Sequence, residues 1–286
     1  MFSTMTPMLS TMTPMLSTMT QIAELPERGV ITLAGADRVA FLQGLVSNDV
    51  ALAAPGQAVF AALLTPHGRW LADFLIFSDG ERLLLDCARA QIPDLLRRLG
   101  RYRLRMAVTL AEAGPEWRVH AAWDGPAPPF PAAVLAAADP RHPRAGTRLL
   151  SPAPLATNAS PDSWDAHRLL LGIPDGPRDL EAEKTLLLEA RYDEFGAISW
   201  AKGCYMGQEL TARTRYRGLV KRRLVPVGIE GPCPPPGTAI LADGEEIGTL
   251  RSGRDGLALA MLAHPLAAAG PFTCAASAVI PRADPA

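Results

Sequence analysis

The stretch Lys202-Gly203-Cys204-Tyr205-Met206-Gly207-Gln208-Glu209 carries more chemical information than any other part of this chain. It places one cysteine between two glycines and two residues after a lysine. The residues that follow, from Gln208 to Thr214, are typical of a short helix. A nearby cation and a helix N-terminus both stabilise a thiolate. We therefore expect Cys204 to act as a nucleophile or a soft ligand, with Lys202 helping to stabilise the thiolate.

The residues around this cysteine predict a tightly built loop. Gly203 and Gly207 allow a positive φ or a close approach of the backbone to another group. We expect Gln208 and Glu209 to fix the loop through hydrogen bonds to the backbone. An acidic residue at this place also favours the helix dipole, so ordinary helix-start chemistry explains the same pair and both interpretations can hold.

The other three cysteines indicate no metal site and no disulfide framework. Cys87 and Cys274 lie in apolar runs that are typical of buried positions, and Cys233 lies in a Pro-rich turn. The chain contains no C-x-x-C pair and no zinc-ligand spacing. Because unpaired cysteines indicate a reducing compartment, we predict a cytoplasmic protein.

Composition predicts a soluble globular protein of two or three domains. The chain has 286 residues, of which 48% are hydrophobic and 20% charged, with a net charge of −1. That balance argues against stable nucleic-acid binding, and we expect no membrane association. One local basic run is a candidate partner surface or, equally, a solvated strand end. It consists of Arg213, Arg215, Arg217, Lys221, Arg222 and Arg223.

The pattern along the chain divides it into three parts. Residues 1–21 repeat the unit Met-Leu-Ser-Thr-Met-Thr-Pro and predict a disordered extension. Residues 22–218 alternate strand and helix patterns, which predicts an α+β region of two subdomains with antiparallel sheet. In this region we expect helices over Ala132–Ala138 and over Ser163–Leu171, the latter capped by Ser163. Residues 219–286 show short strands between Gly and Pro turns, which predicts a small β-barrel.

The segment from Gly196 to Glu209 resembles the signature of the YgfZ-type proteins, which are relatives of the glycine-cleavage T-protein, an aminomethyltransferase. The similarity continues through Arg213 to Gly218. It looks especially close to the mitochondrial branch that helps mature [4Fe–4S] proteins. Upstream, Phe41 to Val50 and Trp70 to Phe77 resemble a helix and a strand that these proteins share.

The resemblance implies a fold, a ligand and a role. The fold is the aminomethyltransferase-like cloverleaf of antiparallel sheets with helices, followed by a small C-terminal β-barrel. The ligand is tetrahydrofolate or a derivative, held in a central opening. The role is iron–sulfur cluster assembly or repair, in support of [4Fe–4S] enzymes such as tRNA-modifying ones. The partners implied are the iron–sulfur assembly machinery and its client proteins.

The resemblance also suggests residues for the folate. Asp73 keeps one of two aspartates of the T-protein strand, and Glu189 matches a glutamate that faces the pterin. Tyr205 could stack on the ring, and Gln208 and Glu209 lie beside it in the motif. Asp73 could equally be a hydrogen-bonded strand carboxylate, and Glu189 a residue of a helix surface.

Three functions are consistent with these observations. The leading one is a folate-binding accessory protein for iron–sulfur proteins, in which Cys204 ligates iron or attacks an oxidised sulfur. The alternative is a folate-dependent one-carbon transferase, an aminomethyltransferase-like enzyme. Ala72 argues against that alternative because it replaces one of the two aspartates. The third is a redox-sensing scaffold around Cys204 without folate.

Overall fold

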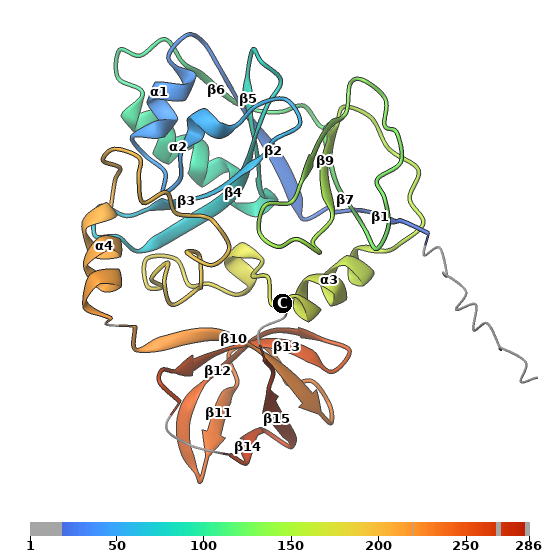
Figure 1. Cartoon of the computed structure of the whole chain (residues 1–286), viewed down its shortest axis with the longest axis vertical. Coiled ribbons are helices and arrows are strands. Elements are labelled where there is room, and N and C mark those ends of the chain that lie inside the picture. The colour runs from blue at the N-terminus through green and yellow to red at the C-terminus, as the bar shows by residue number, and fades with distance from the viewer. Residues whose placement is uncertain (1–18, 219, 267–269, 284–286) are drawn as a thin grey trace, which may run out of the picture.

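The computed structural model describes residues 19–218, 220–266 and 270–283. Most of the extension predicted over residues 1–21 lies outside them, and Gln21 already begins the first strand, β1 (Gln21–Glu24). The described chain forms two antiparallel sheets followed by a closed barrel (Figure 1). The α+β class with a C-terminal barrel, predicted from the sequence, is therefore confirmed.

The first sheet has five strands and is covered on both faces. Its order is β3-β4-β5-β2-β6, with bounds Val59–Leu64, Trp70–Ser78, Leu83–Ala88, Arg28–Ala34 and Thr109–Glu112. Every residue of β4 is buried. Successive side chains of a strand point to opposite faces. Phe74 and Ile76 accordingly pack in the cluster that contains the helices α1 (Arg38–Gln43) and α2 (Ile92–Tyr102), whereas Leu75 packs in the cluster of the opposite face.

The second sheet has four strands, in the order β1-β7-β9-β8. Its further strands are β7 (Arg118–Trp123), β8 (Leu135–Ala138) and β9 (Thr147–Ser151). The helix predicted over Ala132–Ala138 is therefore wrong. Alanine favours a helix intrinsically, but Leu135–Ala138 pair with β9. This tertiary pairing outweighs the weak helix preference of alanine.

One helix and a long irregular segment lie between the sheets and the barrel (Figure 1). The helix α3 (Pro161–Leu170) is capped by Ser160, whose Oγ accepts from the N–H of Ser163 at 3.1 Å. The predicted cap at Ser163 was wrong because Pro161, which lacks an N–H, suits the first helical position and extends the helix backwards. Short 3-10 helices occur at Val50–Leu52, Arg89–Gln91 and Gly176–Arg178. No helix among the described residues is long and apolar enough to cross a membrane.

The barrel closes in the order β10-β13-β12-β11-β14-β15. Its bounds are Arg222–Glu230, Leu257–Ala263, Glu245–Arg254, Ala239–Ala242, Phe272–Cys274 and Ser277–Pro281. A turn at Ala275, where φ is 52°, separates β14 from β15. Arg168 joins α3 to the barrel, since its Nη2 donates to Ser252 Oγ at 2.6 Å.

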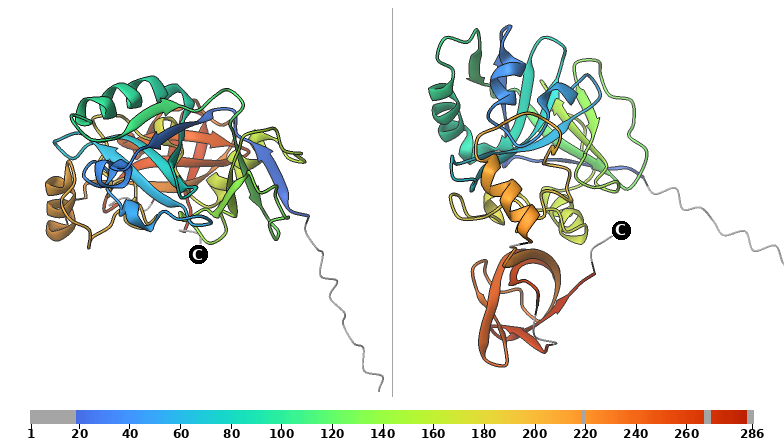
Figure 2. Two further views of the ribbon diagram at one scale, coloured as in Figure 1. Left: turned by 90° about the horizontal axis from the view of Figure 1, so that it is seen from above. Right: turned by 60° about the vertical axis from the view of Figure 1, so that its left-hand side comes forward.

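The helix α4 (Gln208–Arg217) follows the cysteine motif and runs along the side of the molecule, from the first sheet toward the barrel (Figures 1 and 2). It is three residues longer at its C-terminus than predicted. Its cap, Gly207, has φ of 82° and lies against the β3–β4 hairpin. A Cβ added to Gly207 would stand 2.6 Å from the Thr65 carbonyl oxygen and 3.0 Å from the Cα of Gly68. The backbone of Gly207 thus packs the motif directly against the hairpin.

We expect Gly207→Ala to destabilise the protein by about 2–4 kcal/mol, because the new methyl group meets backbone and the φ is unfavourable for alanine. Gly203→Ala is the matched control. It lies four residues away, has no positive φ and no neighbour within 4 Å of an added Cβ, so its effect should stay within about 0.5 kcal/mol. Urea denaturation of both variants measures the difference, and equal stability of the two would contradict this packing.

Candidate functional site

The thiol of Cys204 is exposed and free, and it lies four residues before α4. The neighbouring Gly203 is also open, since a Cβ added to it would have no neighbour within 4 Å. Gly203 does not have the positive φ or the close backbone contact expected of it, whereas Gly207 has both. The described residues contain no group of three His, Cys, Asp or Glu side chains placed to hold a metal ion.

The ammonium of Lys202 is turned inward to the end of α1. Its Nζ donates to three backbone carbonyls, those of Gln43 at 2.7 Å, Val46 at 2.8 Å and Asn48 at 2.7 Å. An ammonium has three protons to donate, and these bonds use all of them. Burial lowers the pKa of Lys202 to about 8, and the nearby Asp49 carboxylate opposes that shift. The structure thus gives Lys202 a structural partnership that the sequence did not predict.

The other motif residues stabilise the loop. Tyr205 is buried, with the Lys202 ammonium 5.3 Å from its ring centre, and its backbone N–H donates to Gln208 Oε1 at 3.3 Å. The backbone N–H of Met206 donates to the carbonyl of Gly44 at 3.1 Å. The carboxylate of Glu209 is exposed and pairs with Arg213 at 3.6 Å. Gln208 therefore makes the loop bond expected of it, and Glu209 makes an ordinary helix-surface ion pair.

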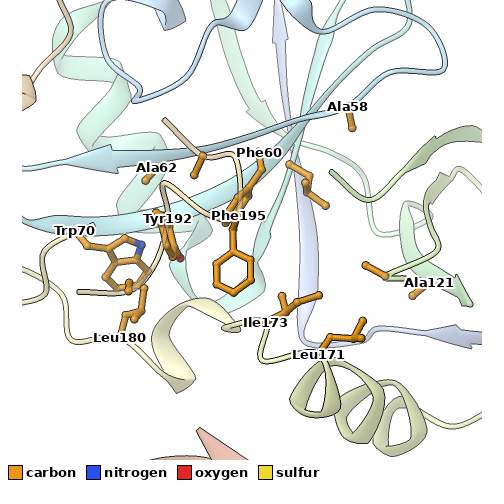
Figure 3. Close-up of a cluster of buried hydrophobic side chains, with 14 of the residues drawn as sticks. Ala58, Phe60, Ala62, Trp70, Ala121, Leu171, Ile173, Leu180, Tyr192 and Phe195 are labelled. Carbon is orange, nitrogen blue, oxygen red and sulfur yellow. The ribbon is translucent and has the colours of Figure 1, made fainter. Parts of the chain in front are cut away.

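Asp73 lies on β4 and is buried. Its Oδ2 accepts from the hydroxyl of Tyr192 at 2.6 Å and from the indole N–H of Trp70 at 3.2 Å. Figure 3 shows the Trp70 and Tyr192 rings together under the first sheet. Burial raises the pKa of Asp73, and the charge of Arg28 opposes that rise. Asp73 is thus a strand carboxylate that protein donors already engage.

Sequence reasoning missed several buried arginine–aspartate pairs. Arg28 Nε donates to Asp86 at 2.7 Å, and Arg168 Nη1 donates to Asp179 at 2.6 Å. Their partners lie 58 and 11 residues away in sequence, so no local sequence pattern predicts these pairs. Further pairs join Arg141 to Asp139, Arg168 to Asp165 and Arg178 to Asp165.

The charge of Arg141 dominates the environment of Asp139. Burial alone would raise the pKa of Asp139, but the guanidinium charge and its hydrogen bonds hold that pKa well below its usual range. Arg148 lies beside the pair and is almost fully buried, and its burial lowers its own pKa. These charges therefore remain ionised through mutual pairing rather than through contact with solvent.

The cavity left between these pairs is small. It measures about 70 Å³ and is lined in part by Arg28, Arg141, Arg148 and Arg168. Because about 15 Å³ suffices for one water molecule, this space holds a few waters or a small ion. None of the five residues predicted to hold folate lines it.

Those five residues do not converge on one cavity. Glu189 is buried away from the centre, where it accepts from Arg222 at 3.3 Å and from the N–H of Leu186 at 3.2 Å. Asp73 is enclosed at the centre, and Glu209 is in solvent. The described structure thus places these side chains in different environments, and folate binding stays a prediction from the resemblance.

A second, larger hollow lies beside α4. This basic groove measures about 410 Å³. It is lined by Arg69, Leu186, Glu189, Leu210, Arg213, Thr214, Arg217 and Lys221. The basic run seen in the sequence divides here. Arg213, Arg217 and Lys221 line the groove, Arg222 pairs with Glu189, and Arg215 stacks on Trp200 with its guanidinium carbon 4.0 Å from the ring centre.

Comparison with solved structures confirms the predicted aminomethyltransferase-like fold. The structure resembles the glycine cleavage system aminomethyltransferase T of Bartonella henselae with a TM-score of 0.72, covering 92% of this chain and 84% of that one. At 14% identity, this likeness concerns the fold alone. The family model described as the C-terminal β-barrel domain of CAF17 matches residues 221–285, which contain the barrel strands.

Sequence comparison identifies the relatives. The human mitochondrial iron–sulfur cluster assembly factor IBA57 is 35% identical over 271 residues, which cover 83% of this chain and 76% of that protein. The mitochondrial IBA57 homologue of Mycosarcoma maydis is 37% identical over 239 residues, which cover 75% of this chain and 59% of the longer fungal protein.

These relatives overturn one prediction. Both are mitochondrial proteins by name, so the cytoplasmic localisation predicted from the cysteines is wrong. Free thiols indicate a reducing compartment, and that property does not single out the cytoplasm. The extent and identity of the match to the human protein show that this chain belongs to the family of IBA57-type iron–sulfur cluster assembly factors.

Proposed function

We propose that this protein assists the assembly of iron–sulfur clusters, with Cys204 as the residue that meets the cluster or its iron. The proposal rests on an exposed thiol in a loop whose residues on both sides, Lys202 and Met206, are bonded to the end of α1 and the segment that follows it. Membership of the IBA57 family supports the role. We extend it to the role of the YgfZ-type proteins, whose motif this chain resembles, and to client [4Fe–4S] enzymes.

The geometry favours ligation over attack on an oxidised sulfur. A thiolate is a preferred ligand of iron in clusters. Because the described residues offer no ready-made metal cluster site, Cys204 would supply one ligand and a partner protein or a small thiol the others. Attack on a disulfide, in contrast, leaves a mixed disulfide that needs a second thiol for release. Two of the three other cysteines, Cys87 and Cys274, are buried.

Complementation tests the role of the thiol. Cells that lack their own homologue receive the wild-type gene, Cys204→Ala or the control Cys233→Ala, and the activity of a [4Fe–4S] enzyme is measured. We expect wild type and the control to rescue, because Cys233 is an exposed thiol of the barrel region. Cys204→Ala should lose most of the rescue. Equal rescue by both variants, at equal protein levels, would reduce Cys204 to a structural residue.

The position of Lys202 distinguishes a role in activating the thiolate from a role in holding the loop, which the sequence alone could not do. If its ammonium served the thiolate, its loss would slow the reaction of Cys204. The ammonium instead donates to three carbonyls, so its loss should leave buried acceptors without donors. Unmade bonds of this kind cost stability.

We therefore expect Lys202→Met to destabilise the protein by about 2–3 kcal/mol, with little effect on thiol chemistry. Urea denaturation gives the first quantity. The rate at which Cys204 reacts with a chromogenic disulfide, in native conditions and a Cys233→Ser background, gives the second. The control is Lys184→Met at an exposed lysine, where the change should stay within about 0.5 kcal/mol. If Lys202→Met reacted at Cys204 ten times more slowly with unchanged stability, Lys202 would be assigned as the partner of the thiolate.

Folate binding stays a prediction from the resemblance, and a thermal shift tests it. A ligand at 100 times its dissociation constant adds about 2.7 kcal/mol to stability. We expect tetrahydrofolate to raise the melting temperature, and no shift would overturn folate binding. Because Tyr192 and Trp70 donate to Asp73 and the central cavity is small, binding there requires the centre to open. A rise in melting temperature that Asp73→Asn abolishes would show that the centre opens to admit the ligand.

A further inference from the structure

The basic groove is formed by one face of α4 and by segments from elsewhere in the chain. Leu210, Arg213, Thr214 and Arg217 follow a spacing of three, four and seven residues, which places them on one side of the helix. Arg69, from the hairpin between β3 and β4, faces them across the groove. Its volume of about 410 Å³ lies in the range of ligand sites in proteins, ~300–1,000 Å³.

The charges of this groove are poorly neutralised. Four of its eight lining residues are Arg or Lys, and Glu189 is the one acidic residue among them. Glu189 is itself paired with Arg222, which lies outside the lining. Neither Arg217 nor Lys221 forms an ion pair with any residue that the structure describes. A protein with a net charge of −1 thus concentrates unpaired positive charge beside α4.

The charge of the groove indicates the kind of ligand that it favours. The exposed Tyr216, and Arg215 with its partner Trp200, are not among the lining residues, because positions 215 and 216 lie on other faces of α4. The near-neutral chain as a whole argues against a nucleic-acid ligand. Carboxylates are the complementary groups for guanidinium forks.

The groove and the exposed thiol of Cys204 belong to neighbouring segments of the chain. Cys204 lies four residues before α4, whereas Arg217 ends the helix, which at 10 residues is about 15 Å long. An extended peptide covers the length of the helix with about five residues. A partner segment in the groove therefore needs only a short extension to span α4 toward the end that carries Cys204.

We propose that this groove binds an acidic segment of a protein partner and so brings that partner to Cys204. The inference builds on the proposed role in cluster assembly, because it names the chemistry of the partner that would meet the thiol. Binding is electrostatic at first contact and should weaken as salt is raised.

Peptide binding tests the groove directly. The probes are a fluorescent peptide of alternating Glu and Ala and its Gln counterpart, measured by anisotropy with the full-length protein. We expect the Glu peptide to bind and the Gln peptide not to. The variant Arg217→Glu with Lys221→Glu should weaken binding at least tenfold. The matched control, Arg103→Glu with Arg105→Glu, makes the same charge change at two exposed arginines outside the groove lining and should bind like wild type.

Equal binding by the groove variant and wild type overturns the proposal, as does equal binding of the Gln peptide. Tighter binding of a single-stranded DNA of the same charge, lost in the groove variant, also overturns it and assigns the groove to nucleic acid.

A second readout tests the link to the thiol. The same peptides carry an activated disulfide at one end, and a Cys233→Ser background leaves Cys204 as the exposed cysteine. Thiolate attack forms a mixed disulfide and releases the chromogenic thiolate. The Glu peptide should label Cys204 several-fold faster than the Gln peptide, because binding raises its effective concentration. Equal rates overturn the link to Cys204. Complementation tests the proposed role separately. Failure of the wild-type gene to rescue, with intact peptide binding, refutes the role in cluster assembly but not the groove.

Discussion

The Lys202 ammonium, held between three backbone carbonyls, is the interaction on which the candidate site depends. Carbonyls at a helix end lack partners within the helix, and here a lysine more than 150 residues away supplies the donors. Because these acceptors belong to the segment that follows α1, the cysteine loop acquires its shape only when the first sheet and its helices have folded. The chemistry of Cys204 is therefore tied to the stability of a distant part of the chain.

The second constraint is the close contact of Gly207 with the β3–β4 hairpin. Together with Lys202 it fixes the backbone on either side of Cys204 while the thiol itself stays exposed. A ligand residue on a rigid base loses little conformational entropy when it binds a metal or a partner. The arrangement suits a thiol that must be presented to another molecule, and it gives the two glycines different roles: Gly207 packs, and Gly203 leaves space.

The sequence predicted correctly those elements that short stretches of residues determine. The barrel was predicted correctly because short strands between Gly and Pro turns define it within short windows. The strand β8 was missed because its pairing with β9 outweighs the helix preference of alanine. At the site, the motif identified Cys204, but the partners of Lys202 could not be read from the sequence, since they depend on contacts across the whole domain.

The distribution of charge connects the fold to the proposed partner surface. At the centre, Arg28, Arg141 and Arg168 each have an aspartate at hydrogen-bond distance, and Arg168 also joins α3 to the barrel through Ser252. Such buried pairs add little net stability, but breaking one is costly. Beside α4, Arg217 and Lys221 have no such partner among the described residues. Uncompensated cations at a surface repel one another. A carboxylate from a second protein would relieve that repulsion, beside the motif that exposes the Cys204 thiol.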